Sequence, residues 1–231
     1  MSSLPAPTLE HPLRDVRARY FCGLLPLGFG YVAMHLCGRA TPFESGDNRW
    51  NDWLGILLSG PALYLLGARH TLVEFTKPIY RGIARNLVGF GVPFFAALHW
   101  EYLGQCTGAN FSLTAHQLAH LNRPSQIALF VGLGIAAGMT TLCVVQARKA
   151  GFLWRYLGAF AALIGTLAAV TACLGPRYYL HIHHYFWSLC LLPFVRFRHP
   201  LCVVIQGMLA GIYVEGASRY GLSPIWILHG G

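Results

Sequence analysis

Three histidines and three tyrosines lie close together in residues 176–187, which have the sequence PRYYLHIHHYFW. The histidines are His181, His183 and His184, and an apolar run follows them as far as Pro193. Neutral imidazole is a common ligand of zinc, copper and iron. A polar group beside membrane-type sequence needs a hydrogen-bond partner or a metal ion. We therefore take this stretch as the first candidate site.

The backbone conformation of this stretch decides which histidines act together. If residues 180–195 are helical from the start, His181 and His184 are three apart and share a face, whereas His183 points elsewhere. If the backbone is extended, His181 and His183 lie on the same side instead. The sequence leaves both arrangements open.

Further candidate groups lie at the same predicted end of the molecule. His116 and His120 are four residues apart, which on a short interfacial helix suits chelation of one ion. His99 and Glu101 are two apart at the end of a predicted helix, so a continuous helix cannot turn both toward the interior. Glu215 lies in the outer half of the last apolar segment, where an ionisable group is costly and marks a functional candidate.

These groups together predict a metal site near the outer surface. A catalytic zinc ion usually has three protein ligands and one open position. The preferred ligands are His181, His184 and one of His99, His116 and His120, with His183 as a further candidate. Glu215 and Glu101 are the catalytic candidates, because a carboxylate can act as a general base or can orient a ligating histidine.

An alternative explanation requires no metal. Histidine and tyrosine are amphipathic and settle at membrane interfaces, where an apolar body meets a wet edge. Histidines at that depth could also ligate haem or relay protons. Eight of the 11 histidines lie at the predicted outer helix ends, and this convergence favours a site over a simple belt.

Composition indicates which elements must position the site. Charged residues make up only 11% of the chain, against about 25% in soluble domains. We therefore expect an all-α integral membrane bundle, in which a span needs roughly 20 apolar residues. The candidate spans are residues 17–37, 53–70, 86–104, 125–147, 152–174, 180–195 and 201–219. Pro26, Pro61 and Pro93 should kink their spans, and glycine pairs at 134/138 and 207/211 should allow close helix packing.

Lysine and arginine indicate the orientation of this bundle. Twelve of the 17 basic residues fall on the side of the N-terminus and five on the other side. The positive-inside rule places the N-terminus in the cytosol and the C-terminus outside. We expect a cytosolic tail at 1–13, one seven-helix domain at 14–226 and a C-terminal end at 227–231, whose sequence is compatible with a fragment of a longer protein. The net charge of +9 is explained by these clusters and by contacts with acidic lipid headgroups, so we expect no nucleic-acid partner.

Four short motifs follow one another between residues 176 and 226. They are HIHHY at 181–185, LLP at 191–193, QGMLAG at 206–211 and GASRYG at 216–221. This region resembles the membrane portion of eukaryotic, chiefly fungal, LCCL-domain-containing membrane proteins. The resemblance implies a membrane bundle with a recurring histidine stretch and implies no particular activity. These 231 residues show no cysteine-rich LCCL module, so the chain is either a membrane-only relative or part of a protein whose module lies outside it.

The seven-helix zinc hydrolases of the alkaline ceramidase and adiponectin-receptor type offer an analogy, since they also hold a three-histidine metal site. They carry an HxxxH pair on a late helix, whereas the last helix here offers Glu215 and no histidine. We expect a metal-binding membrane protein that acts on a lipid-like substrate, by hydrolysis with zinc or by oxidation with copper or iron. The rival expectation is a non-catalytic receptor, scaffold or transporter component.

Overall fold

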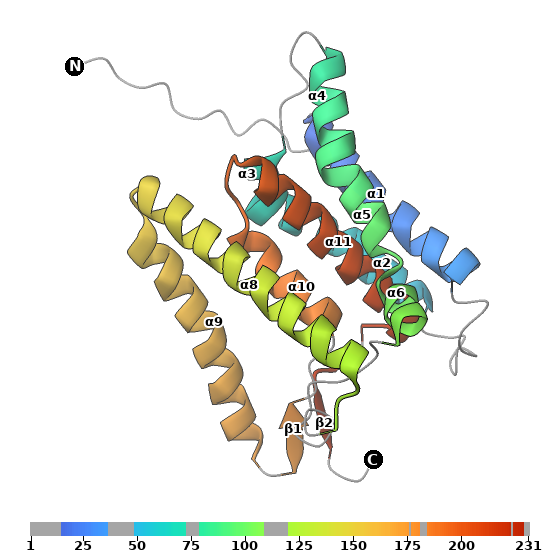
Figure 1. Cartoon of the computed structure of the whole chain (residues 1–231), viewed down its shortest axis with the longest axis vertical. Helices are drawn as coiled ribbons and strands as arrows, with labels where there is room; N and C mark the ends of the chain where they lie inside the picture. Colours follow the sequence, from blue (N-terminus) through green and yellow to red (C-terminus); the bar gives the residue numbers. More distant parts are fainter. Residues whose placement is uncertain are drawn as a thin grey trace.

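The computed structural model is helical over nearly all of the residues that it describes, which are 15–36, 49–72, 79–108, 120–175, 177–180, 184–222 and 224–228 (Figure 1). The helices in chain order are α1 (Val16–Tyr31), η2 (Val32–Leu36), α2 (Arg49–Leu63), η4 (Tyr64–Ala68), α3 (Arg69–Thr71), α4 (Ile79–Asn86), η5 (Leu87–Gly91), α5 (Val92–Ala97), α6 (Trp100–Thr107), α8 (Arg123–Lys149), α9 (Leu153–Leu174), α10 (His184–Leu191), η6 (Leu192–Phe194) and α11 (Pro200–Tyr220). The predicted helical class is confirmed. Helical residues occur in each of the seven predicted stretches.

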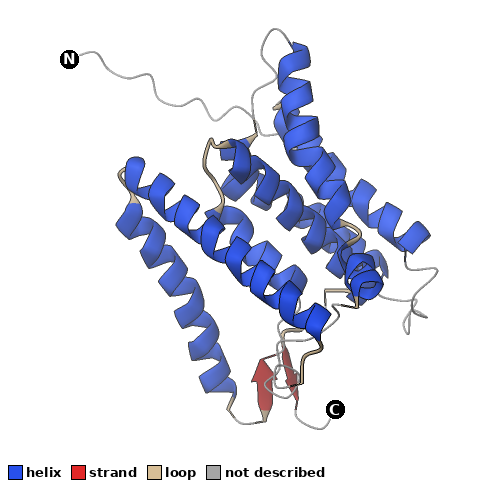
Figure 2. Ribbon diagram, in the orientation of Figure 1, coloured by secondary structure: helices blue, strands red, loops and turns tan. Residues whose placement is uncertain are grey.

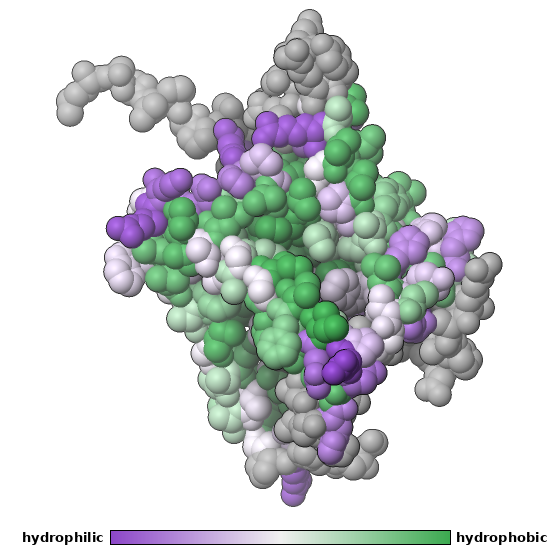
Figure 3. Space-filling model, viewed as in Figure 1, coloured by the Kyte–Doolittle hydropathy of each residue, from purple (hydrophilic) through white to green (hydrophobic). Residues whose placement is uncertain are grey.

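Three of these helices are long and apolar enough to cross a membrane, namely α8, α9 and α11. The first two are nearly unburied within the molecule, and α9 lies along one edge of it (Figure 1). Figure 3 shows mostly apolar residues along this hairpin and hydrophilic residues near the ends of its helices. Such a surface suits lipid rather than water.

The α8–α9 hairpin contacts the core near its turn. Cys143 and Ala147 of α8 are buried in the main hydrophobic cluster. Phe152, in the turn, stacks on Phe197 with the ring centroids 5.8 Å apart. The hairpin is therefore anchored beside the start of α11.

Helix α11 forms the centre of the molecule and packs closely against η5 and α5. A Cβ atom added at Gly207 would overlap the carbonyl oxygen of Phe90, and one added at Gly211 would overlap that of Phe94. The predicted close packing at 207/211 is thus confirmed. Nothing lies within 4 Å of a Cβ atom built at Gly134 or Gly138, so that pair makes no such contact within the described chain.

Each helix that contains a predicted kinking proline also contains a π-helical turn. Pro26 lies in α1 ahead of η2, Pro61 lies in α2 ahead of η4, and Pro93 follows η5 at the start of α5. Proline lacks a backbone N–H and leaves a carbonyl group unpaired in a helix. For Pro93 that carbonyl belongs to Gly89, which lies within η5, so the π turn can accommodate the mismatch there. The turns η2 and η4 begin after Pro26 and Pro61, so they do not contain the corresponding carbonyls.

Two predicted boundaries differ from the structure. The stretch 86–104 is interrupted by a turn at Leu98 and His99, so α6 is a separate helix. The stretch 180–195 is not helical from its start, because Leu180 belongs to a strand and α10 begins at His184. Residues 181–183 lie outside the described residues, as does the predicted interfacial segment 112–120 except for His120.

A short pair of strands was not predicted by the hydropathy pattern. β1 (Tyr178–Leu180) pairs antiparallel with β2 (Trp226–Leu228), with Tyr179 opposite Ile227 (Figure 2). The indole N–H of Trp226 donates to the Thr171 hydroxyl at 3.0 Å. These contacts tie the segment after α11 to the end of α9, on the side from which α10 starts.

Candidate functional site

The carboxylate of Glu215 is fully buried and binds two basic side chains. Its Oε2 atom lies 3.0 Å from the Nε2 atom of His184, at the first residue of α10. Its Oε1 atom accepts a hydrogen bond of 2.8 Å from the Nε atom of Arg219, which is itself buried. Glu215 and Arg219 are four residues apart on α11, so they lie on the same face of the helix. The guanidinium supplies the counter-charge that a buried carboxylate requires.

Helix α11 admits the imidazole because residue 216 is glycine. A Cβ atom at Gly216 would lie 2.7 Å from the Nε2 atom of His184 and 2.8 Å from the Cβ atom of Tyr185. A larger residue would therefore push the start of α10 away from Glu215. The ring of Tyr220 meets His184 edge-on, with the centroids 5.7 Å apart.

The contacts of His184 determine its tautomer. An ionised carboxylate can only accept hydrogen bonds, so Nε2 carries the proton that points to Glu215. In the neutral imidazole the lone pair is then on Nδ1. This is the arrangement in which a carboxylate orients a metal-ligating histidine through its second nitrogen. About 29% of the side chain is exposed, so His184 is accessible to an ion or a proton.

The second predicted carboxylate lies near this group. The Tyr220 hydroxyl donates a hydrogen bond to Glu101 of α6, and the Glu215 charge also acts on Tyr220. Glu101 also accepts a weak contact of 3.4 Å from the Gln105 amide. Tyr220 therefore lies between Glu101 and the His184–Glu215 pair, and both predicted carboxylates are at the end of the molecule that holds His184.

His99 is engaged in a separate cluster. Its Nδ1 atom lies 3.1 Å from the Phe95 carbonyl oxygen, and its Nε2 atom lies 3.1 Å from the Tyr31 hydroxyl. A carbonyl only accepts, so Nδ1 donates to Phe95 and Nε2 accepts from Tyr31 in the neutral ring. The Tyr31 ring also contacts His35. A metal ion could use His99 only by displacing one of these partners.

Of the remaining predicted ligands, the structure describes His120 alone. His120 lies in an exposed turn before α8. His116, His181 and His183 lie outside the described residues. Within the described ranges, no group of three or more His, Cys, Asp or Glu side chains is arranged to hold a metal ion. Among the described residues, His184 is thus the predicted ligand that a carboxylate, Glu215, orients.

Sequence reasoning missed Arg219, Tyr220 and Gly216 as members of the site. Arg219 was included among the basic residues that indicate topology and in the GASRYG motif, but not as a site residue. Its position four residues after a membrane-depth glutamate was a usable signal, because i,i+4 pairs of opposite charge interact on a helix. The role of Gly216 depends on a contact with α10 and has no local signal.

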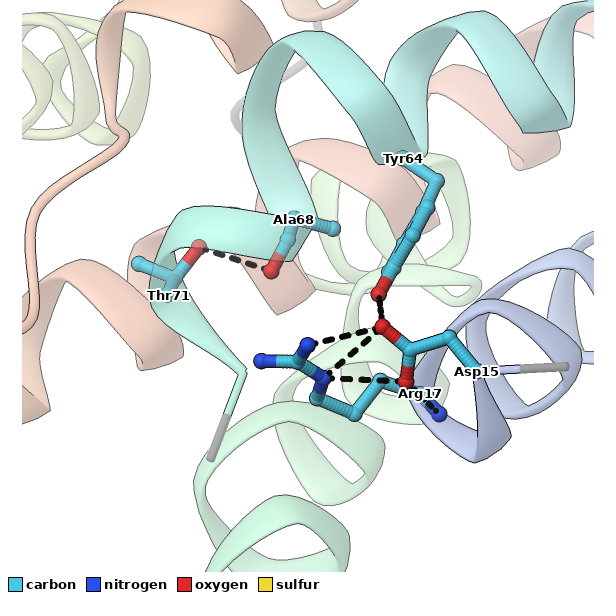
Figure 4. A network of polar contacts seen from close by, with 5 residues as sticks. All are labelled: Asp15, Arg17, Tyr64, Ala68 and Thr71. Atoms are coloured by element: carbon cyan, nitrogen blue, oxygen red, sulfur yellow. Dashed lines mark hydrogen bonds and ion pairs between the residues drawn. The ribbon is translucent and has the colours of Figure 1, made fainter. Parts of the chain in front are cut away.

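Another polar group, drawn in Figure 4, lies where α1 begins, at the end of the molecule that also holds α3 (Figure 1). Asp15 caps α1 by accepting from the Arg17 backbone N–H at 2.9 Å. Its carboxylate also pairs with the Arg17 guanidinium at 2.7 Å and accepts a hydrogen bond from Tyr64. Burial alone raises the pKa of Asp15, but the hydrogen bonds from Arg17 and Tyr64 outweigh it and lower the pKa to about 2. This group joins α1 to η4.

Searches among known protein families, curated proteins and solved structures found no match to this chain. The function is therefore inferred from the geometry of the site.

Proposed function

We propose that this protein is a multi-pass membrane protein that binds a divalent metal ion at its outer end through His184 and neighbouring histidines. The observation that carries the proposal is the 3.0 Å contact between His184 and the buried carboxylate of Glu215. That contact would fix the ring and direct the Nδ1 lone pair away from Glu215.

The membrane assignment is supported by three long apolar helices, two of them almost wholly exposed. Seven crossings with a cytosolic N-terminus remain our preferred topology. Basic residues gather on the side that this topology makes cytosolic, in agreement with the positive-inside rule. The His184–Glu215–Arg219 group would then lie near the outer membrane surface.

Zinc is the first candidate for the ion, because its catalytic sites combine histidine ligands with one open position. His181 and His183 immediately precede His184 and are the nearest further ligands in sequence. A bound zinc ion would supply an activated water for hydrolysis. Glu101, more exposed than Glu215 and linked to the site through Tyr220, would be the carboxylate placed to accept a proton. A substrate at this depth would be a lipid or another amphipathic molecule.

The rival function is a non-catalytic scaffold or receptor in which the same residues only join α10 to α11. The two proposals differ in metal binding. Detergent-purified protein loaded with zinc and desalted should retain about one ion per chain, which elemental analysis measures. His184→Ala should lose most of that metal while keeping its helical content. The control His70→Ala changes an exposed histidine at the opposite end and should keep the metal. Equal metal in all three proteins, or none in the parent, would contradict the proposed site.

A further inference from the structure

Two short basic segments meet at the end of the molecule opposite to His184. One carries Arg69 and His70 in α3, and the other carries Arg196 and Arg198 in the turn between η6 and α11. The charges of these three arginines, and that of Arg17, act on the imidazole of His70. The four side chains thus lie in one electrostatic neighbourhood, and all four residues are exposed or partly exposed at the surface.

A buried polar side chain holds the two segments together. Gln206 of α11 is fully buried, and its Nε2 atom donates to the Leu192 carbonyl oxygen at 3.3 Å. Its Oε1 atom accepts a hydrogen bond from the Thr71 hydroxyl. A Cβ atom at Gly67 would lie 2.9 Å from the same Leu192 oxygen, so η4 and η6 are in close contact. The spacing of the basic segments is therefore set by the core.

One of the arginines is also oriented by an aromatic ring. The guanidinium carbon of Arg196 lies 5.6 Å from the centroid of the Phe152 ring. Phe152 stacks on Phe197 in turn. Such cation–π contacts restrict the guanidinium and leave its N–H donors available for an anion.

The charge of this cluster is not balanced by the described carboxylates. The described carboxylate at this end of the molecule is that of Asp15, which forms an ion pair with Arg17 and accepts a hydrogen bond from Tyr64 (Figure 4). Among the described residues, no carboxylate pairs with Arg69, Arg196 or Arg198. Three guanidinium groups in one place suit a phosphate with two negative charges, which accepts several charge-assisted hydrogen bonds.

Exposed apolar side chains lie within about one helical turn of the basic residues along the chain. Leu65 and Leu66 precede Arg69 by one turn and are 43% and 54% exposed. Leu201, three residues after Arg198, is 55% exposed. A free phosphate would not use this surface, whereas acyl chains below a headgroup would lie along it.

We propose that Arg69, His70, Arg196 and Arg198 bind the phosphomonoester headgroup of an anionic lipid, whose chains lie against the exposed leucines. The inference rests on insertion of the protein in a membrane. It does not depend on the metal site, which uses other residues at the other end.

The test measures the rise in thermal stability of detergent-purified protein as short-chain phosphatidic acid is added. Phosphatidylcholine with the same chains and inorganic phosphate are added in parallel. The triple variant R69Q/R196Q/R198Q should need about 100-fold more phosphatidic acid for the same rise, since each basic residue near an anionic surface contributes roughly a fivefold factor. R198Q alone should need about fivefold more phosphatidic acid for the same rise in thermal stability. Because Arg198 is exposed, this variant still tests the proposal if the triple variant fails to fold.

The control variant R148Q/K149Q/R155Q removes the same number of charges from the α8–α9 turn. It should respond to phosphatidic acid within about twofold of the parent if the site is local rather than a general surface charge. Equal losses in the two triple variants would overturn the proposal. So would equal responses to phosphatidic acid and phosphatidylcholine, and an equal response to inorganic phosphate would overturn the lipid assignment.

Discussion

The Nε2 atom of His184 lies 3.0 Å from the Oε2 atom of Glu215, a carboxylate with no exposed surface. The other oxygen of the same carboxylate binds Arg219. One buried acid thus orients an accessible imidazole and is itself neutralised by a buried guanidinium. The proposed metal site and the stability of the α10–α11 contact both depend on this arrangement.

Replacing Glu215 by Gln should destabilise the protein strongly. The variant leaves the buried Arg219 guanidinium without a counter-charge, and loss of one partner of a buried ion pair costs about 3 kcal/mol or more. Reversible denaturation in detergent measures the change in the free energy of unfolding. Glu101→Gln is the matched control and should cost less than about 1 kcal/mol, because Glu101 is partly exposed. Similar stabilities for the two variants would contradict the assigned pairing.

Gly216→Ala should weaken zinc binding strongly and should change the helical content of the protein little. The added methyl group would meet the Nε2 atom of His184 at 2.7 Å, so the imidazole must move away from its carboxylate. Loss of an orienting carboxylate lowers metal affinity by roughly 10- to 100-fold, which competition with a zinc chelator measures. Gly138→Ala is the control, since no atom lies within 4 Å of its Cβ position. Unchanged affinity in Gly216→Ala would show that the metal does not use His184 as described.

Gly211→Ala should separate α11 from α5. A Cβ atom there would overlap the Phe94 carbonyl oxygen and would lie 2.7 Å from the Cβ atom of Ala97. Overpacking of this kind costs about 1–3 kcal/mol. The midpoint of thermal unfolding should fall relative to Gly134→Ala, which adds a methyl group in open space. Equal midpoints would argue against the close contact of these helices.

The sequence predicted those parts of the fold that depend on neighbouring residues and missed those that depend on contacts between distant residues. Helices α8 and α9 follow from long uninterrupted apolar runs, and each lies within a few residues of its predicted range. The pairing of Tyr178 with Leu228 joins residues far apart in the chain, and no local pattern reports such a contact. The break at His99 was also missed, because hydropathy averaged over a window does not detect a single turn.

The sequence also indicated in part which candidate residues lie together. Glu215 was a candidate because an acid at membrane depth is costly, and the structure places it against His184. The ion pair between Glu215 and Arg219 could have been predicted from their i,i+4 spacing. The hydrogen bonds of His99 with Tyr31 and Phe95 could not have been predicted in this way. The contact with Tyr31 depends on how α1 packs beside the end of α5.

The Asp15–Arg17–Tyr64 group should make stability depend on pH at the acidic end. The pKa of Asp15 is lowered to about 2 from its ordinary value of 3.8. A lowered pKa contributes stability above the unfolded value, and that contribution is lost as pH falls from about 4 to about 2. Thermal unfolding of the parent and Asp15→Asn should therefore differ most above pH 4, and the difference should shrink toward pH 2. A difference that is constant over this range would contradict the assigned pairing.

The most direct test of the metal proposal is X-ray absorption at the zinc edge of the zinc-loaded protein. We expect nitrogen ligands at about 2.0–2.1 Å with the multiple scattering of imidazole, and a reduced imidazole contribution in His184→Ala. Absence of bound zinc, or a spectrum unchanged by the loss of His184, would contradict the proposal. The contact between His184 and Glu215 would then serve only to join α10 to α11.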